Sequence, residues 1–234
     1  MDRRDFLGTC SATAACLTAA ASAPAWAANA QPREYARVLL VDDRGSPLRA
    51  ASLKPQTNYI FHYPFEATPV FLLDLGKPAK PDTLSTPDRG AYRWPGGVGG
   101  RRSIVAFSAI CAHQLAYPSR DVSFISFRKT RAQRGVQDGL IHCCEQNSQF
   151  DPARGAEVLS GPARQPLCAV LLAYDSQSDT LTAHATLGGE LFHPFFQKYQ
   201  AKLSEEVGPT AMHPVSGQSV VRELDRYCKN PIQC

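Results

Sequence analysis

The chain has 234 residues, with 25 Lys and Arg against 21 Asp and Glu, which gives a formal net charge of +4. This mild excess comes without a basic run or interleaved aromatic residues, so the sequence indicates no nucleic-acid site. The 18 Pro and 16 Gly are scattered between short apolar runs. This distribution predicts strands and loops rather than long helices, and the length suffices for one all-β domain with a substantial core.

The first residues resemble an export signal. Residues 2–8 read D-R-R-D-F-L-G, which resembles a twin-arginine motif, and a modest apolar run follows from Phe6 to Ala23. Residues 25–27, A-W-A, fit a small-x-small cleavage site, so residues 1–27 are predicted to be a signal peptide. Twin-arginine export implies a periplasmic location. The run is short and polar for a membrane span, and membrane attachment through an uncleaved signal is the alternative.

Alternation and short apolar runs predict a series of strands along the rest of the chain. They cover residues 36–41, 59–63, 70–75, 104–107, 121–127, 139–142, 169–174 and 180–185. The glycine-rich stretch 93–100 is no phosphate cradle, because no G-K-[ST] follows it. Residues 128–139 are basic and polar and are predicted to form a surface hairpin.

One helix is predicted, over residues 194–206. Phe195, Phe196, Tyr199 and Leu203 recur at helical spacing, and Pro194 stands in the first turn, where proline is favoured. We expect this aromatic stripe to pack against the sheet. From Val207 onward the sequence is predicted to be irregular.

Two segments that follow apolar strands carry soft metal ligands. Residues 108–113 read S-A-I-C-A-H and supply Cys111 and His113. Residues 141–151 read I-H-C-C-E-Q-N-S-Q-F-D and supply Cys143 and Cys144. Thiolates combined with an imidazole suit an iron–sulfur cluster with mixed Cys/His ligation.

The two segments resemble the ligand loops of a Rieske [2Fe–2S] domain, which read C-x-H and C-x-x-H followed by a G-S-x-Y/F-D-like run. The Pro-rich stretch 160–167 resembles the third loop, which covers the cluster in that family. The resemblance spans roughly residues 100–185. It implies an all-β fold, an antiparallel Rieske-type β-sandwich with inserted cluster-binding loops, plus a C-terminal helix. The predicted divisions are the signal 1–27, an N-terminal β extension 28–100, a Rieske-like domain 101–190, and a C-terminal helix and tail 191–234.

The chain departs from the family pattern at the second histidine. Counting back from Ser148 with the usual one-residue gap puts Cys143 in the cysteine position and Gln146 in the histidine position. Closing the gap gives Cys144 and Asn147 instead. An amide oxygen is a hard ligand that is poorly matched to cluster iron, so the fourth ligand is unusual in either register.

The resemblance therefore implies Cys111 and His113 as cluster ligands, followed by Cys144, with Cys143 as the close competitor. A set of all four residues is conceivable, but adjacent cysteines in an extended segment face opposite ways, so both reaching one cluster needs a turn. His142 lies in a predicted strand, and its side chain is expected to point away from the loop.

Two further residues of the second segment bear on the redox potential that the resemblance implies. Ser148 corresponds to the family's serine, whose hydroxyl donates a hydrogen bond to a cluster sulfur. Phe150 stands where the family often has a tyrosine that donates a second such bond. Fewer donors to sulfur imply a lower potential than that of a respiratory Rieske centre.

The remaining cysteines suggest structural roles. Cys168 lies in an apolar run and is predicted to be a buried, inert thiol. Cys228 and Cys234 are predicted to form a small disulfide, because an oxidising compartment would let them pair. High-potential Rieske proteins carry a disulfide between their two loops; here the position near Ala116 is not cysteine, which resembles the Rieske ferredoxins of dioxygenase systems.

The resemblance implies a periplasmic electron-transfer protein with an atypically ligated [2Fe–2S] cluster. Its partner would be a periplasmic redox protein or a larger oxidoreductase complex, and it would serve there as a subunit rather than as a stand-alone enzyme. Two alternatives stay open. The first is a Rieske fold that has lost its cluster and acts as a binding or assembly subunit. The second is a zinc site formed by Cys111, His113 and one or two of His142, Cys143 and Cys144.

Overall fold

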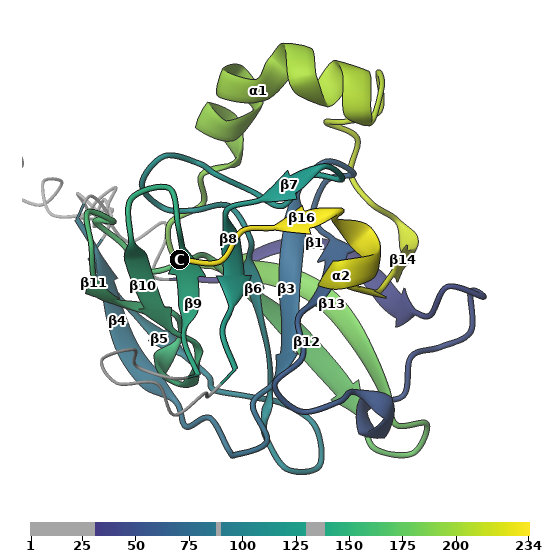
Figure 1. Cartoon of the computed structure of the whole chain (residues 1–234). Helices are drawn as coiled ribbons and strands as arrows, with labels where there is room; N and C mark the ends of the chain where they lie inside the picture. The colour runs from purple at the N-terminus through teal and green to yellow at the C-terminus, as the bar shows by residue number, and fades with distance from the viewer. Residues whose placement is uncertain (1–30, 88–89, 130–138) are drawn as a thin grey trace, which may run out of the picture.

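The computed structural model describes residues 31–87, 90–129 and 139–234. Its largest element is an eight-stranded sheet (Figure 1). The strands are β1 (Arg33–Val41), β2 (Tyr59–His62), β3 (Pro69–Asp74), β6 (Ile104–Ser108), β12 (Ala169–Asp175), β13 (Thr180–Leu187), β14 (Gly217–Val220) and β15 (Arg222–Glu223). Their order is β14-β1-β13-β12-β6-β3-β2-β15. All neighbours are antiparallel except β1 and β14, which run parallel.

A four-stranded antiparallel sheet forms a second layer. It consists of β8 (Ile125–Phe127), β9 (Ile141–Cys143), β10 (Ser148–Asp151) and β11 (Glu157–Ser160), in the order β11-β10-β9-β8. Two smaller pairs complete the strands: β4 (Asp82–Thr86) with β5 (Gly90–Trp94), and β7 (Val122–Ser123) with β16 (Asn230–Pro231). Short 3-10 turns, η2 and η3, occupy Ala50–Ser52 and Pro152–Arg154.

The large sheet is apolar on both faces, so its central strands β3 and β6 are buried along their whole length. On one face Phe71 and Phe107 pack in a core with Ile141 and Phe150 of the four-stranded sheet. On the other face the strands of the same sheet enclose a second core, which contains Leu40 of β1. Burial on both faces explains why these strands read as continuous apolar runs rather than as alternating ones.

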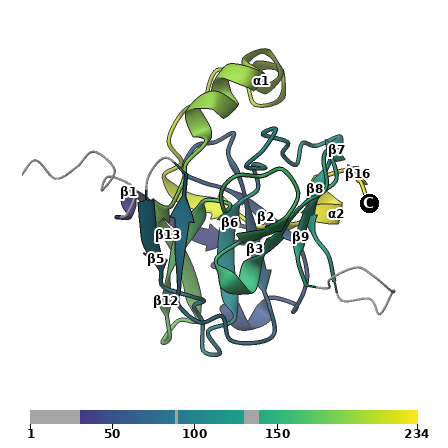
Figure 2. The same cartoon turned by 90° about the vertical axis from the view of Figure 1, so that its left-hand side faces the viewer.

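The helix α1 (Phe192–Glu206) confirms the predicted helix, with an additional two residues at its start. It stands at one end of the molecule, beyond the sheets (Figures 1 and 2). Its apolar face packs on loop residues, among them Ile110 and Tyr117, and not on the sheet. The expectation that the aromatic stripe covers the sheet is therefore corrected: both faces of the central strands are already covered by other strands.

Six predicted strands are confirmed as β1, β2, β3, β6, β12 and β13. The predicted strand 121–127 is broken into β7 and β8, which pair with different partners. The predicted strand 139–142 corresponds to β9, which begins two residues later. The segment from Val207 onward is not irregular, because it contains β14, β15, a short helix α2 (Leu224–Tyr227) and β16. These elements form through pairing with distant strands, which local sequence does not reveal.

The polar stretch 128–139 joins β8 to β9, which pair antiparallel, and the Gly139 N–H donates to the Arg128 carbonyl at its base. This agrees with the predicted hairpin, whose residues 130–138 lie outside the described part of the chain. The predicted signal peptide also lies outside it. Strands of the predicted segments 28–100, 101–190 and 191–234 share the large sheet. Among the described residues, no helix is long and apolar enough to cross a membrane.

Candidate functional site

The first loop, residues 109–118, leaves the end of β6 and carries Cys111 in a tight turn. The Cys111 N–H donates to the Ala116 carbonyl at 2.8 Å, and the Leu115 N–H donates back to the Cys111 carbonyl at 3.0 Å. Leu115 adopts a left-handed conformation with φ of 61° to close this turn. The short main-chain ring fixes the position of Cys111 at the end of the sheet.

The helix α1 supports the first loop from outside. Phe195 lies with its ring centroid 5.0 Å from that of Tyr117, and the Tyr117 hydroxyl donates to Glu206 at 3.1 Å. The Lys198 ammonium donates to the Gln114 carbonyl at 2.5 Å. These contacts come from the first half of the helix and from its last residue, so α1 acts as a brace for the segment that presents Cys111.

The second loop, residues 144–147, joins β9 to β10. Cys143 ends β9 and lies directly opposite Ser148, the first residue of β10. Asn147 has a φ of 58°, a left-handed conformation that asparagine adopts more readily than most residues. The residues at the tip of the turn are exposed, whereas Cys143 and Ser148 at its base are each 1% exposed.

The two loops bring the thiols of Cys111 and Cys143 together in the core. Each residue is 1% exposed, and the two side chains are hydrogen-bond partners. The main-chain N–H groups of His113 and Gln114 donate to the Cys111 sulfur, and that of Glu145 donates to the Cys143 sulfur. Donors aimed at sulfur favour the negatively charged form, which is the form that binds metals.

The hydrogen bond from Cys143 is the largest influence on the pKa of Cys111 and lowers it to about 7, against the opposing effect of burial. The pKa of Cys143 is raised, because its thiol donates to Cys111 and because it is buried. The first proton therefore leaves the pair readily and the second does not.

The cover loop, residues 160–167, closes over the second loop. The Ala163 N–H donates to the Ser148 hydroxyl oxygen at 3.2 Å. Gly161 has a φ of +87° and passes so close that an added Cβ would lie 2.5 Å from the Ser148 Cα. Ala163 and Leu167 belong to the same core cluster as Cys111 and Cys143. The Pro-rich stretch thus packs against the second loop and shares a core cluster with the two thiols.

The structure does not bring the predicted histidine ligands to the thiol pair. His113 is partly exposed on the first loop, and Gln146 and Asn147 are exposed at the tip of the second. His142 precedes Cys143 in β9 and therefore faces the other side of that sheet, as expected. Among residues 31–87, 90–129 and 139–234, no group of three or more His, Cys, Asp or Glu side chains is placed to hold a metal ion.

The expectation that Cys144 is the preferred cysteine ligand of the second loop is wrong. It forms a disulfide with Cys234, 90 residues away, with the two Cα atoms 5.5 Å apart. The sulfur that faces Cys111 belongs to Cys143. Of the two alignments that the sequence left open, this arrangement favours the one that starts from Cys143. In that alignment the C-x-x-X spacing places Gln146 in the position of the missing histidine.

The predicted pairing of Cys228 with Cys234 is also wrong. Cys228 is a free thiol in the core, 1% exposed, at the end of α2. From there the chain runs along β7, where the Ile232 N–H donates to the Ser123 carbonyl. Six extended residues span roughly 20 Å, well beyond the Cα separation that a disulfide allows. Cys168 is buried, and burial raises its pKa, in agreement with the predicted inert thiol.

Sequence reasoning missed Arg128, which lies beside the disulfide. Its guanidinium donates to the Cys144 sulfur at 3.0 Å and to the Ile232 carbonyl at 3.0 Å. Nothing in the local sequence indicates this role, since Arg128 stands in a polar, basic stretch that reads as a solvated loop. Only the convergence of three distant segments reveals it.

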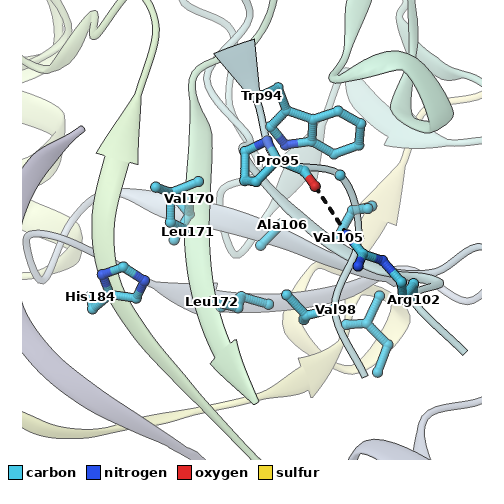
Figure 3. A pocket seen from close by; sticks show the side chains of 13 residues that line it. Trp94, Pro95, Val98, Arg102, Val105, Ala106, Val170, Leu171, Leu172 and His184 are labelled. Carbon is cyan, nitrogen blue, oxygen red and sulfur yellow. Dashed lines mark hydrogen bonds between the residues drawn. The ribbon is translucent and has the colours of Figure 1, made fainter. Parts of the chain in front are cut away.

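A separate hollow of about 180 Å³ lies beneath the glycine-rich stretch 93–100 (Figure 3). Its wall includes Trp94, Val98 and Leu172, and Arg102 donates to the Pro95 carbonyl at 3.3 Å beside it. No cysteine lines this hollow. The glycines serve close main-chain packing, since an added Cβ at Gly96 would lie 2.6 Å from the Ala79 carbonyl oxygen.

The two sheets and the site around Cys111 and Cys143 together define an all-β protein with a buried pair of cysteine thiols beside three loops. No protein-family model matches the chain. In shape the chain is similar to the soluble domain of the Rieske protein II (soxF) from Sulfolobus acidocaldarius. The two share 24% sequence identity with a TM-score of 0.47, over 67% of this chain and 82% of that one.

Proposed function

We propose that this protein transfers single electrons through an iron–sulfur centre of Rieske type that is bound between its first and second loops. The observation that carries the proposal is the meeting of Cys111 and Cys143. Two buried thiols from separate segments, Cys111 in the first loop and Cys143 at the base of the second, each receive main-chain N–H donors and form the sulfur half of such a site. The order of the loops and the cover loop above them match the resemblance found in the sequence.

Of the four ligands of a [2Fe–2S] cluster of this type, Cys111 and Cys143 already stand together, and the first loop carries a third candidate, His113, whose side chain is not placed beside them. Cys111 and Cys143 would hold one iron, and His113, two residues after Cys111, would hold the other. The fourth position falls on Gln146, which is exposed on the second loop. A bound cluster would supply one-electron oxidation and reduction. The fourth ligand would then be an unusual one, such as an amide oxygen or a solvent molecule.

The protein's own contribution to electron transfer is control of the surroundings. The N–H groups of His113, Gln114 and Glu145 stabilise charge on the two sulfurs, and such bonds tune the potential of a cluster. The cover loop and the core keep water from the sulfur side. His113 and the tip of the second loop form the exposed side, through which a redox partner protein would exchange electrons.

The proposed cellular location rests on the resemblance of the first residues to a twin-arginine signal. We place the mature protein in the periplasm, with a periplasmic redox protein or a larger oxidoreductase complex as its partner. This step depends on the sequence of residues 1–27 alone.

A second candidate function is a scaffold that keeps the fold without the cluster. It is favoured by one observation: the described residues offer two converging thiols and no third metal-binding side chain beside them. Such a protein would bind or assemble with others through its loops and would carry no redox centre.

The deciding experiment is metal and sulfide analysis of the mature protein purified without oxygen, with EPR after dithionite reduction. Two irons, two acid-labile sulfides and a reduced [2Fe–2S] signal support electron transfer. Zinc alone would indicate a structural site, and a folded protein without metal would indicate the scaffold. Cys111→Ser should abolish iron binding and Cys168→Ser should leave it unchanged; equal iron in both variants would sink the site assignment.

The fourth position is tested by adding a histidine. Because Cys143 faces Cys111, Gln146→His should shift the spectrum toward that of an ordinary Rieske centre, and Asn147→His should not. A shift with Asn147→His alone would reverse the register. The absence of any shift in both variants of an iron-loaded protein would mean that the second loop does not approach the cluster.

A further inference from the structure

The Cys144–Cys234 disulfide fastens a C-terminal tail, residues 229–234, to the second loop. The tail crosses from α2 past β7 and ends beside β9 (Figure 1). Arg128 lies against the joint: its guanidinium is 3.0 Å from the Cys144 sulfur and 3.7 Å from the Cys234 sulfur. The same group holds the Ile232 carbonyl.

Apart from the disulfide, the tail is held by a short set of hydrogen bonds: the Lys229 N–H donates to the Arg120 carbonyl, the Ile232 N–H to the Ser123 carbonyl, and Arg128 to the Ile232 carbonyl. Its β16 pairs over two residues with β7, and one of these is Pro231, which has no N–H to donate. Lys229 forms an ion pair with Asp121, and both side chains are highly exposed, so the pair adds little. A few such bonds return less free energy than is lost by ordering six residues. The position of the tail therefore depends on the disulfide.

Among the cysteines that the structure describes, the accessible ones are those of the disulfide. Cys234 is exposed and Cys144 is half-buried, whereas Cys111, Cys143, Cys168 and Cys228 are all buried. The Arg128 guanidinium is placed to stabilise the negative charge that a sulfur carries as it leaves. Exposure and a stabilised leaving group are the properties that distinguish labile disulfides from structural ones.

We propose that Cys144–Cys234 is a thiol–disulfide exchange site, and that its reduction by a protein dithiol releases the tail from the second loop. One thiolate of the dithiol attacks the exposed Cys234 sulfur, and the bond to Cys144 breaks. Cys144 leaves beside Arg128 and takes a proton from solvent. The second thiolate of the dithiol then attacks the mixed disulfide and frees Cys234. Two electrons and two protons pass from the dithiol, which becomes a disulfide.

Release of the tail changes access to the neighbouring thiols. Cys144 adjoins Cys143, so the disulfide restrains the turn that begins directly after Cys143. Without it, this end of the second loop is held by the Cys144 N–H bond to the Phe124 carbonyl, at 2.6 Å, and by the pairing of Cys143 with Ile125 and Ser148. A looser turn exposes the Cys143 sulfur more often. The tail thus acts as a redox-controlled fastening beside the candidate site, whether or not a cluster is bound there.

The test uses the full mature protein in native buffer with dithiothreitol as the dithiol. Samples are taken over time, alkylated with iodoacetamide and mapped by mass spectrometry, with hydrogen exchange of residues 229–234 measured in parallel. Cys144 and Cys234 should become labelled together, at least tenfold faster than the buried Cys168, and exchange in the tail should rise with the same time course. Because the readout is on these two residues, a protein that fails to bind iron can still pass.

Two variants complete the design. Arg128→Gln should slow reduction about tenfold, whereas Gln233→Ser, which keeps the disulfide and its arginine, should leave the rate unchanged. Labelling of Cys144 and Cys234 no earlier than Cys168 would overturn the exchange site. Reduction without increased exchange in the tail would overturn its release. Circular dichroism of each sample distinguishes local release from unfolding.

Discussion

Ser148 lies directly opposite Cys143 across the β9–β10 pair, so the two side chains share one face of the four-stranded sheet. The hydroxyl oxygen of Ser148 accepts a hydrogen bond from the Ala163 N–H in the cover loop. One residue therefore connects the strand that carries a site thiol to the loop that covers it.

Ser148→Ala should destabilise the protein by about 1–3 kcal/mol, because it leaves the buried Ala163 N–H without its acceptor. Chemical denaturation gives the difference in unfolding free energy. Ser216→Ala, at an exposed position, should change stability by no more than about 0.5 kcal/mol. Equal effects of the two substitutions would show that the hydrogen bond between Ser148 and the cover loop contributes nothing to stability.

Gly161→Ala tests the close approach of the cover loop. An added Cβ would meet the Ser148 Cα at 2.5 Å and the Asn147 carbonyl oxygen at 2.6 Å. Gly45 has a similar φ of +77° with nothing within 4 Å, so Gly45→Ala incurs only the conformational penalty. Gly161→Ala should therefore cost about 1–3 kcal/mol more than Gly45→Ala. Matching losses in urea denaturation would mean that the cover loop moves aside freely.

Phe195→Ala tests the brace that α1 provides. Phe195 is fully buried against Tyr117 of the first loop, and removing such a ring costs about 3–5 kcal/mol. Hydrogen exchange should also accelerate in residues 109–118. Met212→Ala, at a position 62% exposed in the same region, should have little effect on either quantity. Unchanged exchange in the first loop, despite a loss of stability, would contradict the bracing role.

His62 should make the protein less stable in mild acid. Its pKa is lowered to about 4, first by burial and then by Arg120 and Arg222, with Glu66 acting in the opposite direction. The neutral ring lies 3.2 Å from the Tyr227 hydroxyl. Since the unfolded chain takes up this proton near pH 6.5, the contribution of neutral His62 is complete above that pH and is lost as the pH falls toward 4.

The loss amounts to about 3 kcal/mol over that range. His62→Gln should flatten the dependence of unfolding free energy on pH between 6.5 and 4, relative to the parent protein. His193→Gln, at an exposed position, serves as the control and should leave the slope as it is. If the His62 variant keeps the full slope, other groups cause the acid sensitivity.

The central strands and the helix could be predicted because their signals are local. The sequence marks apolar faces in β3 and β6 by continuous apolar runs and in the helix by the spacing of Phe195 and Leu203. In the structure these residues are buried. The two thiols of the candidate site could also be predicted from local signals. Cys111 and Cys143 stand at the ends of apolar strands, and strands of one core bring their ends together.

The choice between Cys143 and Cys144 could not be made in the same way. The two residues are adjacent, and a strand turns neighbouring side chains to opposite faces, so a single residue of register decides which sulfur enters the core. The prediction that the segment after Val207 is irregular was wrong for a related reason. Its β14 exists only through pairing with β1, more than 170 residues earlier.

The sequence by itself determined the strand-rich class, the helix and the two loops with their thiols, because hydrophobic periodicity and turn residues act over a few positions. The tertiary structure alone decided which thiols meet, that Cys144 is bonded to Cys234, and that Arg128 stands beside them. A disulfide across 90 residues is selected by which side chains the packed fold brings within reach. Spacing along the chain carries no information about such distances.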